Sequence, residues 1–110
     1  MHDELDAMND ETTAAVAKAL AHPARLHILR LLARQKECMG AELFGDLPLA
    51  QSTISQHLAV LKDAGIVVSH SVGTGSVYCL DPEVVTAFSD EMASIVIAVP
   101  TCEPQEEERR

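Results

Sequence analysis

The stretch from residue 51 to residue 64 carries the side chains best suited to contact a nucleic acid. Its sequence, QSTISQHLAVLKDA, has Ile54, Leu58 and Leu61 at the i, i+4, i+7 spacing of one helix face. The opposite side of the first two turns carries six polar side chains: Gln51, Ser52, Thr53, Ser55, Gln56 and His57. Glutamine can pair with adenine in the DNA major groove, and serine or threonine can contact several bases. The segment is therefore a candidate DNA-contacting helix, and a solvated polar face is the alternative.

The cysteines are the second set of residues that could do chemistry. Cys38, Cys79 and Cys102 are odd in number and lack the short spacing of zinc fingers and redox motifs. This argues against an extracellular disulfide framework and favours free thiols in a reducing compartment. Thiolates bind soft ions, although each cysteine could instead be a small buried apolar residue.

Residue patterns typical of an enzyme are missing from the sequence. It has no Ser-His-Asp order, no glycine-rich phosphate loop and no close cluster of His and Cys. We expect His22 and His27 to be capping or partly buried imidazoles. His57 lies on the polar side of the candidate DNA helix, and His70 has no evident nucleophile or metal partner nearby. The sequence therefore predicts a binding protein that is not an enzyme.

Composition and charge limit the remaining classes. With 110 residues, 47% of them hydrophobic, the chain has the size of one domain. The net charge of −9 is carried by the ends, because residues 23–80 contain five Lys and Arg residues against four Asp and Glu residues. No apolar run approaches the roughly 20 residues of a membrane span, and the acidic first ten residues are unlike a secretion signal. We expect a cytoplasmic protein without a membrane segment.

The helices and strands that must position these side chains can be predicted from the spacing of apolar residues and from capping and turn residues. Residues 1–9 form a polar leader, and Asp10 is expected to cap a first helix that ends near Ala21. Pro23 opens a second, largely apolar helix over 23–34. After an extended bridge at Cys38 and Met39, residues 41–44 form a short helix. A tight turn at 45–48 then leads to the helix from residue 51, which completes a helix-turn-helix.

The rest of the chain predicts a β-wing and a last helix. The β-branched runs 66–72 and 76–80 flank Gly73-Thr74-Gly75, which indicates a hairpin. Asp81 and Pro82 open a helix whose apolar stripe comprises Val85, Phe88, Met92, Ile95 and Val99. Residues 100–110 form an acidic, solvated tail. The expected fold is mainly α with a small β-wing, a winged helix-turn-helix over residues 10–99.

A small domain cannot cover the apolar stripes of both its first and its last helix. We therefore expect these two helices to pack against a second copy in a twofold homodimer. Such a dimer presents two DNA-contacting helices to successive major grooves about 34 Å apart, so the operator should be an imperfect palindrome of double-stranded DNA.

Three sequence segments resemble the ArsR/SmtB family of winged-helix repressors. They are AHPARLHILRLL, ECMGAELFGDLPLAQSTISQHLAVLKDAGIV and SVYCLDP, and the resemblance covers about residues 13–92. It implies a homodimer that binds its operator until an inducer, usually a toxic metal or metalloid ion, lowers the affinity. The residues matching the family's base-contacting segment are Gln51, Ser52, Thr53, Ser55, Gln56 and His57.

The resemblance does not identify the inducer, which has to be inferred from the candidate ligand residues of this chain. Zinc-responsive members resemble one another in His and Asp ligands on the last helix, but residues 81–110 contain no histidine. The arsenic-responsive branch often has a cysteine pair beside the short helix, whereas here only Cys38 lies there. In a winged helix the bridge before the short helix usually pairs with the returning wing strand. This pairing would place the Cβ atoms of Cys38 and Cys79 about 4.5–5.5 Å apart. Cys102 could then complete a three-sulfur site for arsenite or antimonite.

We therefore expect a transcriptional repressor released from DNA by arsenite or antimonite bound at Cys38, Cys79 and Cys102. Two alternatives stay open. The same cysteines could respond to oxidation or persulfide by forming a sulfur bridge. The acidic net charge also fits a winged helix that binds a protein and never DNA.

Overall fold

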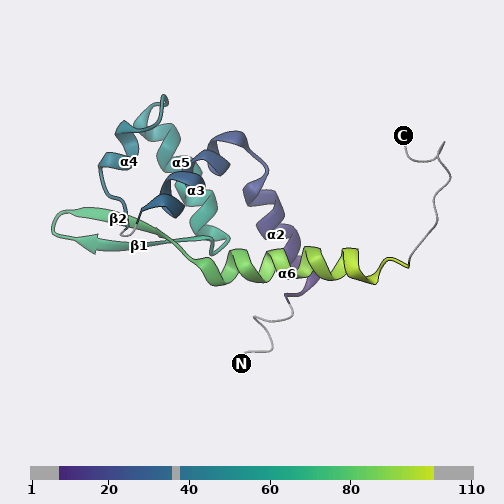
Figure 1. Cartoon of the computed structure of the whole chain (residues 1–110). Coiled ribbons are helices and arrows are strands. Elements are labelled where there is room, and N and C mark those ends of the chain that lie inside the picture. Colours follow the sequence, from purple (N-terminus) through teal and green to yellow (C-terminus); the bar gives the residue numbers. More distant parts are fainter. Residues whose placement is uncertain (1–7, 36–37, 101–110) are drawn as a thin grey trace.

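The computed structural model describes residues 8–35 and 38–100. A group of helices packs together, a two-stranded β-hairpin projects from one side of it, and a long final helix runs along its base (Figure 1). The expected fold class, mainly α with a small β-wing, is confirmed. The order of elements is also as predicted, and the differences lie at their ends.

The first two described helices begin at side-chain caps. Helix α2 spans Asp10–Leu20, and its N-cap is Asn9, whose Oδ1 accepts from the N–H of Thr12 at 2.8 Å. The prediction of Asp10 as the cap was wrong by one residue, and its carboxylate instead lies in the first turn, where the helix dipole favours an acid. Helix α3 spans Pro23–Arg34 as predicted, and the Nδ1 of His22 accepts from the N–H of Ala24 at 3.0 Å.

Helices α4 and α5 form the predicted helix-turn-helix. Helix α4 spans Glu42–Gly45, and α5 spans Gln51–Asp63. Helix α5 ends where Gly65 adopts a φ of 79°, a left-handed conformation that costs glycine little because it has no Cβ. The buried side of α5 is the predicted stripe: Ile54 and Leu61 are 0% exposed and Leu58 is 2% exposed.

The wing is an antiparallel hairpin of β1, Val67–Val72, and β2, Gly75–Leu80. Its turn contains Gly73 at a φ of 61°. Met39 adds an isolated antiparallel bridge to the other edge of β2. The N–H of Met39 donates to the carbonyl of Tyr78 at 3.0 Å, and the N–H of Tyr78 donates to the carbonyl of Met39 at 2.7 Å. The chain segment before α4 is thereby tied to the wing.

Helix α6, Pro82–Ala98, starts at Asp81, whose Oδ1 accepts from the N–H of Glu83 at 3.0 Å. Its first half joins the core, since Ala87 is buried and Val84, Val85 and Phe88 pack against the core. The fully buried large side chains come from the other four described helices, from β1 and from the residue just before β1: Val16, Ile28, Leu43, Ile54, Leu61, Ile66 and Val67. Met8, which the sequence analysis assigned to the polar leader, also lies in this core.

The second half of α6 leaves its apolar side chains in solvent. Ile95 is 57% exposed, Val96 70% and Ile97 80%, and Figure 1 shows this part of α6 extending past the helical body. Isolated apolar side chains on a surface are ordinary, but a contiguous set indicates a binding surface. We expect it to be covered by a second copy, as the sequence predicts for the last helix. On α2, by contrast, Val16 and Ala19 are buried within the protomer. In the described part of the chain, every helix is too short or too polar to span a bilayer.

Replacing Ile95 with Glu tests this expectation, because the exposed side chain can change without disturbing the core of one protomer. A carboxylate buried at the seam lacks a partner, so the dimer should dissociate while its far-ultraviolet circular dichroism persists. The matched control is Thr86→Glu at an exposed polar position of the same helix. Sedimentation velocity at micromolar concentration measures the outcome, and a native protein that sediments as a monomer would contradict the expectation.

Candidate DNA-contact surface and cysteine site

The first two turns of α5 present a polar surface of short side chains. Gln51, Ser52, Ser55 and Gln56 are exposed, whereas Thr53 and His57 are half-buried. The helix starts at Ala50 without a side-chain hydrogen bond to its first turn. Backbone N–H groups of that turn are therefore available to an anion such as a DNA phosphate. The arrangement is chemically suited to the predicted DNA contact, and the roles of the six residues stay a prediction.

Helix α5 is held by packing beneath its buried stripe. Leu43 of α4 is 0% exposed and Leu47 of the turn is 6% exposed, and both belong to the same core as Ile54. Helix α5 also contacts α2, α3 and β1. This packing fixes the angle at which the polar surface faces outward.

His57 has a neighbour that the sequence analysis missed. Its ring lies against the ring of His22, with 4.5 Å between the centroids and 56° between the planes. Burial lowers the pKa of His57, and the nearby His22 and Arg25 lower it further. No local pattern predicts this contact, because the packing of α3 on α5 brings together two residues that are far apart in the sequence.

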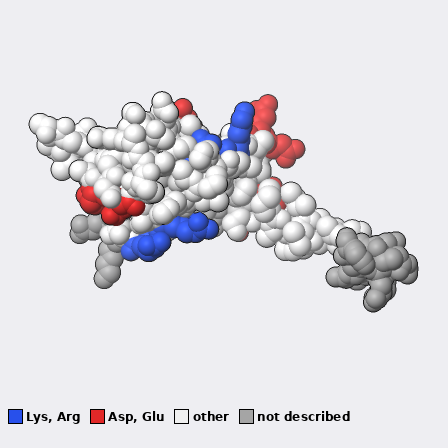
Figure 2. Space-filling model, turned by 90° about the horizontal axis from the view of Figure 1, so that it is seen from above, with Lys and Arg blue, Asp and Glu red and all other residues white. Residues whose placement is uncertain are grey.

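Basic side chains are sparse around the candidate DNA surface. The described elements carry Lys18 on α2, three arginines on α3 and Lys62 in the last turn of α5, and α4, the wing and α6 carry none. In Figure 2 the blue side chains lie on the helical body, while the wing end on the left is white. The charge available for phosphate contact therefore comes from the helical body.

Cys38 and Cys79 lie together between the helix-turn-helix and the wing. They form a disulfide with a Cα–Cα distance of 4.6 Å across a sequence separation of 41 residues. The cause is the backbone pairing of Met39 with Tyr78, which sets the preceding and following residues opposite each other on antiparallel strands. The predicted closeness of Cys38 and Cys79 is confirmed.

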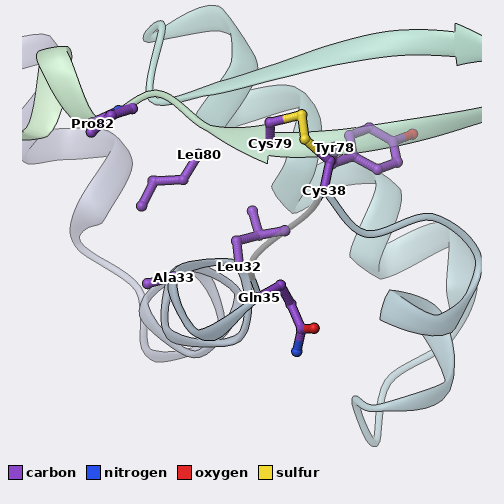
Figure 3. A pocket seen from close by; sticks show the side chains of 8 residues that line it. All are labelled: Leu32, Ala33, Gln35, Cys38, Tyr78, Cys79, Leu80 and Pro82. Carbon is purple, nitrogen blue, oxygen red and sulfur yellow. A yellow bond between two sulfur atoms is a disulfide. The ribbon is translucent and has the colours of Figure 1, made fainter.

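A small cavity lies beside the disulfide. Its volume is about 210 Å³, and Figure 3 shows Leu32 and Leu80 on one side of it and the two sulfurs on another. Gln35 contributes a polar side chain at its edge. Cys38 is exposed and Cys79 is half-buried, so small solutes can reach the pair.

The third predicted ligand, Cys102, lies outside the described residues. Within the part that the structure describes, no group of three or more His, Cys, Asp and Glu side chains could hold a metal ion. The donors that the structure brings together are thus two sulfurs, enough for a disulfide or for part of a three-sulfur site.

Comparison with known proteins identifies the family. Residues 22–69, from the cap of α3 to the start of the wing, match the bacterial regulatory proteins of the arsR family. CmtR of Mycobacterium bovis, an HTH-type transcriptional regulator, is 32% identical over 102 residues, which cover 93% of this chain and 86% of CmtR. The chain belongs to the arsR family.

Two further relatives match part of this arsR-family chain. The HTH-type regulator Rv0081 of Mycobacterium tuberculosis is 41% identical over 63 residues, which cover 57% of this chain and 55% of that protein. The arsenic resistance transcriptional regulator ArsR1 of Pseudomonas putida is 41% identical over 73 residues, or 66% of this chain and 57% of ArsR1. The chain therefore spans little more than half the length of these two relatives.

Solved structures agree with the fold. An ArsR family transcriptional regulator, RHA00566, superposes with a TM-score of 0.72 at 25% identity, covering 83% of this chain and 93% of that one. The homodimeric winged helix-turn-helix DNA-binding domain Mb0332 of Mycobacterium bovis gives a TM-score of 0.63 at 26% identity, with coverages of 87% and 89%. The winged helix-turn-helix of this arsR-family chain is thus a fold that also occurs as a homodimer.

The cysteine geometry generates a direct prediction. Treatment of the reduced protein with diamide should join Cys38 to Cys79 within one chain, because their Cα distance lies in the range of about 4.4–6.8 Å that disulfides require. Alkylation followed by mass spectrometry should then detect one remaining reactive thiol, that of Cys102. Cys102→Ser is the control and should form the same bridge, whereas a bridge that includes Cys102 would contradict the pairing.

Proposed function

We propose that this chain is a homodimeric, DNA-binding transcriptional repressor whose operator affinity falls when Cys38 and Cys79 react with an inducer. The single observation that carries the proposal is the position of this pair, which joins the segment before α4 to strand β2 of the wing. The helix-turn-helix, the wing and the dimer helix α6 all connect to this point.

The DNA-contacting part of the proposal is supported by the exposure of α5. Its exposed residues Gln51, Ser52, Ser55 and Gln56 form a polar surface at the helix start, opposite the buried stripe. Thr53 and His57 flank this surface. A helix presented in this way can enter the major groove, with amides and hydroxyls at base edges.

Coupling to the cysteines has a short physical route. Cys79 is followed by Leu80 and then by Asp81, the N-cap of α6. The N–H of Asp81 donates to the carbonyl of Ile66 at 2.8 Å, just before β1 begins. A change at Cys79 therefore acts on the angle of α6 against the rest of the protomer. In a dimer joined through α6, that angle sets the spacing of the two α5 helices.

The chemistry that the geometry supports best is thiol oxidation. The structure holds the pair as a disulfide. In a reducing compartment the pair would rest as two thiols, which the backbone bonds between Met39 and Tyr78 keep opposite each other. An oxidant such as peroxide removes two electrons and two protons from the pair, and the sulfurs join while peroxide is reduced to two waters. The disulfide favours one shape of the dimer. Oxidation can release DNA only if that shape binds the operator less well than the reduced dimer does.

A thiophilic ion is the second candidate, and the relatives favour it. ArsR1 is named for arsenic resistance. Arsenous acid would condense with both thiols, forming two As–S bonds and releasing two waters, and the thiol of Cys102 from the same protomer or its partner would add a third As–S bond and release a third water. The donor set of soft sulfurs fits arsenite or antimonite, and it uses the same two described cysteines.

Substitutions on α5 test DNA binding. Ser52→Ala, Ser55→Ala and Gln56→Ala should each weaken specific binding by about 1–3 kcal/mol where a base contact is lost, with folding unchanged. Fluorescence anisotropy with a duplex selected from a random-sequence pool by the native protein measures the loss. Ser89→Ala, exposed on α6, is the matched control. Equal affinity of all four variants would remove α5 from base contact, and failure to select any duplex would favour a protein-binding winged helix.

Substitutions at the cysteines test the switch. Oxidation or arsenite should loosen the native complex roughly 5- to 150-fold, which corresponds to the usual coupling of about 1–3 kcal/mol. Cys38→Ser and Cys79→Ser should bind DNA like the reduced native protein and ignore both inducers. Cys102→Ser tests the third sulfur, because it should keep release by diamide and lose release by arsenite only if a third sulfur is needed. The candidates are separated by which of the two inducers releases the native protein. A Cys38→Ser, Cys79→Ser double variant that is still released by either inducer would refute the proposed site.

A further inference from the structure

The elements expected to face DNA lack the side chains that usually neutralise phosphates. Between Met39 and Leu61, and again across the wing, there is no Lys or Arg, although these residues supply most phosphate contacts in DNA-binding proteins. The same elements carry the imidazoles of His57 and His70. A phosphate beside α5 can meet the backbone N–H groups of its first turn, but a positively charged partner must come from histidine or from a neighbouring helix.

One cluster meets this requirement at the flank of α5. His57 lies against His22, with ring centroids 4.5 Å apart, and Arg25 of α3 is close enough to act on its charge. The Nδ1 of His22 accepts a hydrogen bond from the N–H of Ala24. In neutral His22 the ring proton is therefore on Nε2, which can donate a hydrogen bond. Two groups able to carry positive charge, His57 and Arg25, thus lie near the Nε2–H donor of His22.

The charge of Arg25 is poorly compensated in the described structure. Its Nε is buried and has no hydrogen-bond acceptor among the described residues. Arg25 also lines a groove of about 360 Å³ together with Lys18 of α2 and Asp63 of α5, one further cation and one anion, and this groove does not include His22 or His57. Strand β1, which also packs on α5, contributes His70 as its titratable group. The groups whose charge acts on His57 are His22 and Arg25.

We propose that His22, Arg25 and His57 form a phosphate site at the flank of α5, which takes a backbone phosphate of the bound duplex with uptake of a proton by His57. The inference rests on the proposed DNA binding and deepens it. In the free protein, burial and the neighbouring positive groups keep His57 neutral by lowering its pKa. A phosphate at the cluster reverses the sign of the local field and raises that pKa.

The direction of the pH effect follows from linkage. His57 has the lower pKa when free and the higher pKa in the complex, so the complex binds more protons than the free components. Operator affinity therefore rises as the pH is lowered through the interval between these two values, and this gain is absent above the pKa of the complex. One proton can change the affinity by at most tenfold per pH unit.

The experiment measures affinity for a duplex selected by the native protein from a random pool, between about pH 6 and about pH 8 at constant salt. The native protein should bind about three- to tenfold more tightly at the lower pH. In a salt series at each pH, the plot of log affinity against log salt concentration should be steeper by about 0.9 at the lower pH. His57→Gln should lose most of this dependence. His57→Arg should bind tightly at both pH values, because its charge is permanent. Circular dichroism checks that each variant is folded.

The control is His27→Gln, an exposed histidine of α3 that lines a different groove with Leu47 and Leu49. It should keep the native pH dependence. In parallel, nuclear magnetic resonance follows the His57 ring through a pH titration, and the midpoint should rise when the duplex is added. An unmoved midpoint, a pH-independent native affinity, or full pH dependence in His57→Gln would each overturn the phosphate site while leaving DNA binding intact. Failure to bind any duplex at any pH would instead reject the proposed function and this site with it.

Discussion

The pair of backbone hydrogen bonds between Met39 and Tyr78 is the constraint on which the arrangement depends. It joins a segment from the first half of the chain to the outer edge of β2, and so fixes the helix-turn-helix relative to the wing. The same pairing sets Cys38 opposite Cys79 and leaves the pair reachable from solvent. Without it, the sulfur pair would not be defined.

The balance of charge has a separate consequence. A net charge of −9 gives the chain no long-range attraction to DNA, so short-range contacts must supply much of the affinity. Among the described residues, the basic side chains lie on α2, on α3 and in the last turn of α5. We infer that histidines at the flank of α5 replace part of the missing charge, which makes DNA affinity depend on pH as well as on the cysteines.

Much of the fold could be predicted because local signals agreed with tertiary packing. The i, i+4, i+7 stripe of Ile54, Leu58 and Leu61 is buried, and Gly65 ends α5 in the left-handed conformation. The cap of α2 was misplaced because Asn9 and Asp10 are both good caps, and only the backbone decides between them. The closeness of Cys38 and Cys79 could be predicted only through the family's strand order, since no spacing rule joins residues that far apart.

The remaining site features depend on packing that sequence does not encode locally. The contact of His22 with His57 arises from the crossing of α3 over α5, and a sequence shows only that each is a histidine. The exposed end of α6 was predicted as part of one long stripe, but the structure divides it at about Met92 into a half that packs on the core and a half that does not. That division shows which residues are free to meet a second copy.

The central claim is that the state of the cysteine pair sets the spacing of the two α5 helices in a dimer. Pulsed electron paramagnetic resonance can measure that spacing with a spin label on a keto amino acid at the exposed position of Lys62, which leaves the cysteines untouched. The account predicts that reduced protein samples distances compatible with grooves about 34 Å apart, and that DNA narrows this distribution. Oxidation with diamide should move the mean distance in native protein and leave it unchanged in the Cys38→Ser, Cys79→Ser variant. Identical distributions for reduced and oxidised native dimers would contradict the account.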